Sequence, residues 1–292
     1  MDSMVYWNWK ATIVSEFSAN VSYANMPLMG KAIYDTPIFT DYRTQKTNRG
    51  VTDTRHTFQA TAAYKYSNPV KGLFFNIRPM YNRTSGNILY ESNMNGNVYT
   101  MTATDRDYAM QTIGLSGRIS KTFGWAKTLI GLGASHNITC YSMLVSGNIN
   151  DARMNSTTAT LNYSLRPASI LSVEGKSVMS AYKQKNLTSP ELSSGSTTDW
   201  EHHLNLYVFP LNGLMLSIKN ELFHTNDKSI GTNYFLDLAI SYKSKHWELS
   251  LAADNIIGSS RFERRTLGNT IESYSVTRLR QRDILAKWSV DL

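Results

Sequence analysis

The amino-acid sequence predicts an all-β fold, an antiparallel transmembrane β-barrel segment with about 12 strands. Three observations predict it: many segments alternate between apolar and polar residues, aromatic residues bracket aliphatic ones within a segment, and short connections alternate with long ones. Charged residues make up 18% of the 292 residues, below the roughly 25% typical of soluble domains. The sequence contains no run of 18 apolar residues, so no transmembrane helix is expected.

The clearest alternation lies near the C-terminal end of the chain. Tyr234, Leu238 and Tyr242 point one way in a strand, while Asp237 and Ser241 point the other way. Aromatic residues at both ends of an aliphatic middle are expected where a strand crosses both membrane interfaces. Other segments repeat the pattern, namely 57–65, 112–119, 158–165, 203–208 and 247–254.

The connections between these segments fall into two classes. The short ones carry the turn residues Pro, Gly, Asn and Lys, and lie near 67–72, 123–127, 166–169, 210–213 and 243–246. The long ones lie near 25–54, 83–107, 141–153, 183–199, 226–233 and 258–273. Bacterial outer-membrane barrels have short periplasmic turns and longer outer loops, so this sorting favours such a barrel over a soluble sandwich.

The N-terminal residues predict that the chain starts in the middle of a barrel. Twelve full strands are expected between Glu16 and Leu292, and Val5–Lys10 reads as the lower end of one more. A barrel closed by a partial strand would leave backbone groups unpaired in lipid, at several kcal/mol each. We therefore expect residues 1–292 to form one barrel segment, the C-terminal half of a larger barrel. The opening residues have no secretory signal pattern.

The last part of the chain, from Asp254 onward, carries motifs of a known family. The chain has Asp254-Asn255-Ile256-Ile257-Gly258 after a strand, then Arg261-Phe262-Glu263-Arg264-Arg265, and then a final strand with Ile284, Trp288 and Val290. Two earlier stretches, Thr36–Arg43 and Lys71–Asn76, fit the same order. This order resembles the end of a TonB-dependent outer-membrane receptor of the type common in Bacteroidetes.

The resemblance implies a 22-stranded barrel in the cell outer membrane that imports a scarce nutrient, such as an iron chelate, cobalamin, a glycan or a peptide. It also implies partners. These are a plug domain and TonB, both reached through an N-terminal part that this sequence lacks, the barrel-insertion machinery, and in some members a surface lipoprotein. The insertion machinery reads the last residue, which is usually aromatic in the family and is Leu292 here.

Two groups of residues are candidates for contact with ligand or plug. The first contains aromatic and charged residues placed by the pattern in or beside outer loops, where binding residues concentrate: Tyr42, Tyr90, Glu91, Trp200 and Phe262. The second contains charged residues expected on the lumen side of strands: Lys65, Arg118, Glu174, Lys176, Lys219, Glu221 and Glu248. The plain interpretation of the second group is a wet wall that hydrogen-bonds the plug, and the alternative is direct substrate contact.

Three arginines near the end form a separate hypothesis. Simple alternation gives Arg278, Arg280 and Arg282 the same lipid-facing side as Ile284. An Arg at the midplane of a barrel costs about 2–4 kcal/mol, falling to about 0–1 kcal/mol near the interface. We therefore expect these arginines at the outer rim, in contact with lipopolysaccharide phosphates; a bulge would turn them into the lumen instead.

No enzyme, metal or cofactor pattern is found in the sequence. Glu221 and His224 are three residues apart, which places them on opposite faces of a strand, and His136 and Cys140 lie about 13 Å apart. Cys140 is the single cysteine, so no intrachain disulfide forms. The net charge of +8 comes from scattered bases, which argues against nucleic acid.

Two rival functions stay open at this stage. One is an independent small outer-membrane barrel that acts as a passive pore, an adhesin or a lipid enzyme. It predicts that the first and last strands pair and that the N-terminal piece folds away. The other is a soluble β-rich protein, against which the aromatic-bracketed strands argue.

Overall fold

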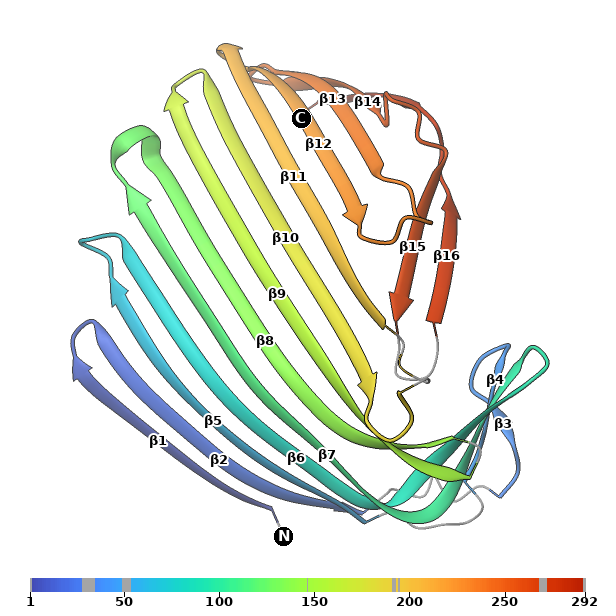
Figure 1. Ribbon diagram of the computed structural model, residues 1–292. Helices are drawn as coiled ribbons and strands as arrows, with labels where there is room; N and C mark the ends of the chain where they lie inside the picture. The colour runs from blue at the N-terminus through green and yellow to red at the C-terminus, as the bar shows by residue number, and fades with distance from the viewer. Residues whose placement is uncertain are drawn as a thin grey trace.

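The computed structural model describes residues 2–27, 35–48, 54–145, 147–190, 193, 195–267 and 272–290. Its main sheet follows one antiparallel path of hairpins (Figure 1). The strands of this path are β1 (Ser3–Thr12), β2 (Ser15–Pro27), β5 (Thr54–Asn68), β6 (Leu73–Asn95), β7 (Val98–Phe123), β8 (Thr128–Val145), β9 (Asn148–Ala168), β10 (Leu171–Asn186), β11 (Gly195–Leu211), β12 (Leu214–Thr225), β13 (Asn233–Lys243), β14 (Trp247–Asp254) and β17 (Asp283–Val290).

Four shorter strands lie off this path. β3 (Ile38–Phe39) pairs with β4 (Thr44–Thr47), and β4 also pairs in parallel with β7. β15 (Arg261–Leu267) and β16 (Glu272–Arg278) form a separate hairpin between β14 and β17. A 3-10 turn, η2 (Trp125–Lys127), joins β7 to β8. Among the described residues, no helix is long and apolar enough to cross a membrane.

The predicted all-β antiparallel fold is confirmed, and so is the sorting of connections. The short turns, such as those joining β1 to β2 and β11 to β12, lie at the upper left of Figure 1, while β3 and β4 lie at the opposite end. Several of the predicted long loops are wrong in their conformation, and the predicted loop 258–273 contains β15 and the start of β16. Residues 83–107 and most of 141–153 continue as paired strand, and β6 turns into β7 at Gly96, which has a φ of +59°. Hairpin pairing satisfies the backbone groups of these segments outside the lipid zone.

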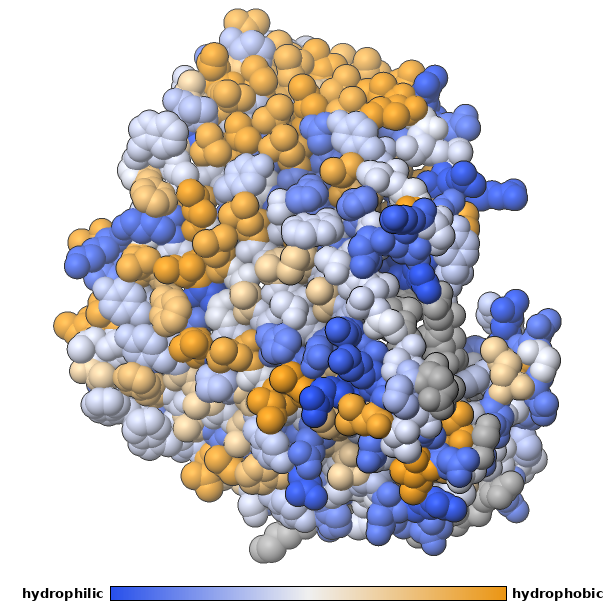
Figure 2. All heavy atoms as spheres, in the orientation of Figure 1, coloured by the Kyte–Doolittle hydropathy of each residue, from blue (hydrophilic) through white to orange (hydrophobic). Residues whose placement is uncertain are grey.

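The register places most of the apolar residues of the path strands on one face. Leu249 of β14 pairs with Tyr242 of β13 and with Trp288 of β17, and these residues share a face because directly paired residues do. The same holds at the other end of the sheet, where Phe17 of β2 pairs with Trp9. Figure 2 shows hydrophobic side chains gathered over the end with the short turns, and hydrophilic ones over β15 and β16. This apolar face is the outward face of the sheet.

The sheet is not closed. Its path begins at β1 and ends at β17, and within the described residues these two strands do not pair with each other. β1 is exposed along its whole length, with Trp7 at 52% and Trp9 at 53%. Both ends of the sheet therefore present unpaired strand edges.

Most of the buried apolar residues among those described lie beyond the short-turn half of the sheet, in the outer extensions of β6 to β9. Ile88, Ala103, Leu144 and Ala152 are all buried there. β6 bends far enough to pair in parallel with β8 through Glu91 and its neighbour. The extended hairpins thus pack on one another as a cap with its own small core.

Candidate functional site: the lumen wall and its hairpin

The inner face of β10, β11 and β12 carries a polar ladder. Lys176 pairs with His203, and His203 pairs in turn with Glu221. The Nδ1 atom of His203 lies 3.4 Å from Oε1 of Glu221. Glu174 and Lys219 lie on the same face one pair further along, both beside Asn205. The structure thus brings together four of the lumen-facing charged residues that the sequence indicated.

The other residues of that prediction lie on separate strands. Lys65 is on β5 beside Glu16, Arg118 is on β7 beside Asn76, and Glu248 is on β14 beside Lys243. Each shares the inward face, as predicted, but none joins the ladder on β10 to β12. These isolated groups suit a wetted wall rather than one binding centre.

The β15–β16 hairpin packs against the inner face of β12 and β13. The ring of Phe262 meets that of Phe223 edge-on at 5.3 Å between centroids, and lies 6.3 Å from that of Phe235. Phe223 and Phe235 are 6.1 Å apart, and His203 is 5.7 Å from Phe223. Edge-to-face pairs at these distances contribute about 0.5–1.5 kcal/mol beyond their buried area. Phe262 therefore fastens the hairpin to the wall.

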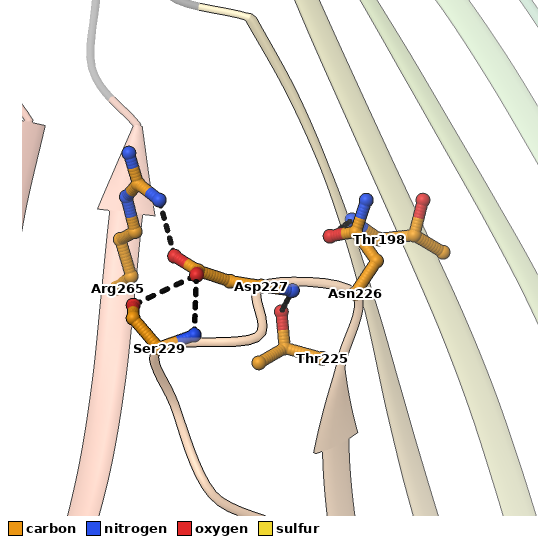
Figure 3. A network of polar contacts seen from close by, with 6 residues as sticks. All are labelled: Thr198, Thr225, Asn226, Asp227, Ser229 and Arg265. Atoms are coloured by element: carbon orange, nitrogen blue, oxygen red, sulfur yellow. Dashed lines mark hydrogen bonds and ion pairs between the residues drawn. The ribbon is translucent and has the colours of Figure 1, made fainter.

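A polar network holds the same hairpin from its other side (Figure 3). Arg265 of β15 forms an ion pair with Asp227, in the loop between β12 and β13. Ser229 donates hydrogen bonds from its N–H and its hydroxyl to Asp227, at 2.9 and 2.7 Å. Asn226 exchanges two hydrogen bonds with the backbone of Thr198, each 2.9 Å long, and so fixes this loop to β11.

The network also keeps the carboxyl group of Asp227 ionised. The hydrogen bond from Arg265, followed by those from Ser229, lowers the pKa of Asp227 to about 2. Asp227 is therefore ionised at any physiological pH. Sequence reasoning did not single out Asp227, Phe223 or Phe235. The two phenylalanines had a signal, because they are large aromatic residues on the otherwise polar side of their strands.

Between the hairpin and the wall lies a cavity of about 100 Å³. It is lined by Glu201, Phe223, Asn233, Phe262 and Arg264, among others. Ligand pockets usually measure about 300–1,000 Å³. The cavity is therefore a junction between hairpin and wall, too small to enclose a nutrient chelate.

Tyr90 and Glu91 lie on the outer extension of β6, where they join neighbouring segments. The hydroxyl of Tyr90 donates to Oδ1 of Asn48 at 3.1 Å, and the ammonium of Lys46 lies 4.3 Å from its ring centroid. The carboxylate of Glu91 accepts the N–H of Gly147 at 2.9 Å. Both residues therefore hold the cap together.

Tyr42 is the most open of the predicted ligand-binding residues, with 86% of its surface exposed. It lies in the turn between β3 and β4. The carboxylate of Asp41 accepts backbone N–H groups of Arg43 and Thr44, both at 2.8 Å, and the first of these bonds lowers the pKa of Asp41 most. The guanidinium of Arg43 lies 5.3 Å from the ring centroid of Tyr42. This turn presents an aromatic ring and a cation together at the outer end.

Trp200 lies within a strand rather than in a loop. It is part of β11, on the outward face, where it pairs with Met179 and stacks on His202 at 6.2 Å between ring centroids. Its environment is the apolar outer surface, so an interface role fits it better than ligand capture.

The expected common face of Arg278, Arg280 and Arg282 is wrong. Arg278 ends β16, in a different sheet from β17, and residues 279–282 are not strand, so alternation does not carry across them. Arg280 forms an ion pair with Asp283 at 3.3 Å. The Nε of Arg282 donates to the carbonyl oxygen of Ile256 at 2.9 Å. The contact of these arginines with lipopolysaccharide stays a prediction.

Metal ligation has little support in the described part of the chain, where no group of three or more His, Cys, Asp or Glu residues could hold an ion. Glu221 and His224 do lie on opposite faces, since Glu221 pairs with Phe235 on the lumen side and His224 pairs with Trp200 on the outward side.

No protein-family model and no curated protein matches the chain. Among solved structures, it is similar to a G324V variant of the ferric enterobactin receptor PfeA from Pseudomonas aeruginosa, with a TM-score of 0.58 and 10% identity over 92% of this chain and 42% of that one. It is also similar to the siderophore receptor PirA from Acinetobacter baumannii, with a TM-score of 0.54 and 9% identity over 98% of this chain and 47% of that one.

The chain thus spans less than half the length of these receptors. At about 10% identity the likeness concerns the fold, which is the antiparallel wall of an outer-membrane β-barrel.

Proposed function

We propose that this chain forms the C-terminal part of the barrel of a TonB-dependent receptor, which imports a scarce nutrient across the cell outer membrane. The observation that carries the proposal is the open sheet. Its apolar face looks outward, and its two end strands, β1 and β17, do not pair within the described residues. Unpaired backbone groups in lipid cost several kcal/mol each, so further strands are expected to complete the barrel.

Two further observations support transport over the rival functions. The similar structures are receptors of about twice the length, which supports a non-enzymatic role. A closed barrel of 12 strands requires β1 to fold away, yet β1 is paired with β2 along nine residue pairs. The likeness to Bacteroidetes receptors rests on sequence motifs and stays a prediction, as do the plug, TonB and lipoprotein partners.

The position of the β15–β16 hairpin fits the proposed transport role. Phe262 and Arg265 hold β15 and β16 over the lumen side of the sheet, where a plug or a passing ligand would meet them. The class of nutrient stays open among iron chelates, cobalamin, glycans and peptides, because loops and plug decide it.

The test is the intact mass of the native polypeptide in purified outer membranes, detected with an antibody raised against a peptide of residues 258–273. The proposal expects a mass far above 33.0 kDa, since plug and further strands belong to the same chain. A mass near 33.0 kDa would instead support the small independent barrel. Absence of the protein from the outer-membrane fraction would contradict both the receptor proposal and the small-barrel alternative.

A further inference from the structure

The outward face of β2, β5 and β6 changes character sharply at its outer end. Tyr23, Phe58 and Tyr81 form the last aromatic positions of the apolar face, and Arg83 is the next outward residue of β6. Arg83 comes ten residues after Leu73, the first residue of β6. At about 3.3 Å per residue and a tilt of about 40°, that is roughly 25 Å, the height of the apolar band of a barrel. Arg83 therefore lies level with the lipid headgroups.

Arg83 is exposed, and no hydrogen bond or ion pair ties its guanidinium to any other described residue. Beside it lies an open hollow of about 660 Å³, lined also by His56, Ser85, Asn87 and Asp107. A charged group beside lipid that has no partner among the described residues is expected to take one from its surroundings, because leaving it unpaired costs free energy.

A second polar group points to the same place. The hydroxyl of Tyr23 is 2.8 Å from Nδ1 of His56, and the two rings stack with centroids 6.1 Å apart. This contact fixes the imidazole on the outward face and leaves its Nε2 available. His56 pairs directly with Ser85, which is the next outward residue of β6 after Arg83. Arg83, His56 and Ser85, which can all donate hydrogen bonds, thus line the hollow together.

We propose that this hollow binds a phosphate group of an outer-leaflet lipid, namely the lipid A phosphate of lipopolysaccharide. The proposal rests on the outer-membrane function proposed above. Arg83 gives the phosphate a forked pair of N–H donors, and His56 and Ser85 complete its contacts. The carboxylate of Asp107 belongs to the outer end of the hollow, because Asp107 comes four residues, or about 13 Å of strand, before Gln111, the partner of Arg83.

The location favours a lipid over a soluble anion. Arg83, His56 and Ser85 face away from the lumen, on the side shared with Phe58 and Tyr81, so a nutrient passing through the barrel does not reach these three residues. Aromatic rings directly below the cationic group match the boundary between acyl chains and headgroups.

The test uses the complete natural protein, purified from outer membranes in a mild detergent and stripped of lipid. Binding of bisphosphorylated lipid A is measured by native mass spectrometry for the wild type, for Arg83→Gln and for Arg78→Gln. Arg78 is the matched control, because it is an exposed arginine on the same strand that faces the lumen. We expect the affinity to fall about tenfold or more in Arg83→Gln and to stay unchanged in Arg78→Gln.

Further arms identify the ligand. Dephosphorylated lipid A should bind the wild type as weakly as the intact lipid binds Arg83→Gln, and Asp107→Asn should bind as well as the wild type or better. Equal affinity of Arg83→Gln and the wild type overturns the site while leaving the transport proposal standing. Full displacement by inorganic phosphate at the same concentration overturns the lipid as occupant. A wild-type protein absent from the outer membrane overturns both proposals.

Discussion

The ring of Tyr163 on β9 lies over the backbone of Gly175, its direct partner on β10. A β-carbon added at Gly175 would overlap the Cζ, hydroxyl and Cε1 atoms of that ring. Gly175 thus makes room for an aromatic side chain on the outward face. In turn, the ring covers the backbone of Gly175, which has no side chain to cover it.

Gly175→Ala should therefore force the Tyr163 ring out of place and destabilise the sheet by about 1–3 kcal/mol. The matched control is Gly117→Ala, also on the outward face, where an added β-carbon meets nothing nearer than 3.5 Å. Urea unfolding in detergent, followed by tryptophan fluorescence, measures both. Equal midpoints for the two variants would show that the ring moves at no cost.

Phe262→Ala should loosen the β15–β16 hairpin without unfolding the sheet. The variant loses ring contacts with Phe223 and Phe235, worth about 1–3 kcal/mol together with the lost burial. Hydrogen exchange of the β15 and β16 amides should accelerate, while exchange in β9 and β10 stays as it is. Val276→Ala is the control, because Val276 is half exposed and pairs with Glu263 rather than with Phe262. Unchanged exchange in Phe262→Ala would contradict the fastening role of this ring.

Acid should release the same hairpin in a narrow window of pH. The carboxyl of Asp227 has a pKa of about 2 in the folded protein and near 3.8 when unperturbed. Because the folded pKa is depressed, the contribution of the ion pair is fully present above about pH 4 and is lost as the pH falls through about 2.

A dye on a cysteine introduced by Thr277→Cys, with Cys140→Ser, reports this release. We expect its fluorescence to change between about pH 4 and pH 2. The change should be absent in Asp227→Asn, which keeps an acceptor for Ser229 and lacks the charge. A transition of the same size in Asp227→Asn would assign the titration to another group.

Tyr90→Phe should weaken the cap, since it leaves the buried side-chain oxygen of Asn48 without its donor. We expect a local cost of about 1–3 kcal/mol and faster hydrogen exchange at the β4 amides. Tyr42→Phe, in the exposed turn before β4, should leave that exchange unchanged. If Tyr90 served only a ligand, exchange in the ligand-free protein would not respond to its substitution.

Much of the wall was predictable from sequence because a strand between water and lipid repeats its pattern every second residue. Leu238 and Ile240 lie on the apolar face as their alternation indicated, and Val5–Lys10 does belong to one more strand. The pattern holds wherever lipid selects one face.

The hairpin and the cap were beyond such reasoning. The common face predicted for Arg278 and Ile284 was wrong because residues 279–282 are not part of a strand. Such a break in strand pairing cannot be recognised from composition. The pairing of Asp227 with Arg265 joins residues 38 positions apart, a relationship that the topology alone brings about. Trp200 was placed in or beside a loop because polar residues flank it. Those neighbours belong to the same strand, and their side chains lie on its inner face.

The small core around Ile88, Ala103 and Leu144 gives this chain two kinds of environment, a lipid-facing wall and a cap packed like a water-soluble domain. The two parts therefore tolerate different amino-acid substitutions. On the wall, exposed leucines such as Leu249 face outward and the buried Ser217 faces inward, while in the cap the apolar residues are the buried ones. A foreign sequence inserted at the turn around Gly147 should therefore be tolerated as it would be in a loop of a water-soluble domain. The same insertion within the wall would be tolerated only if its residues suited contact with lipid.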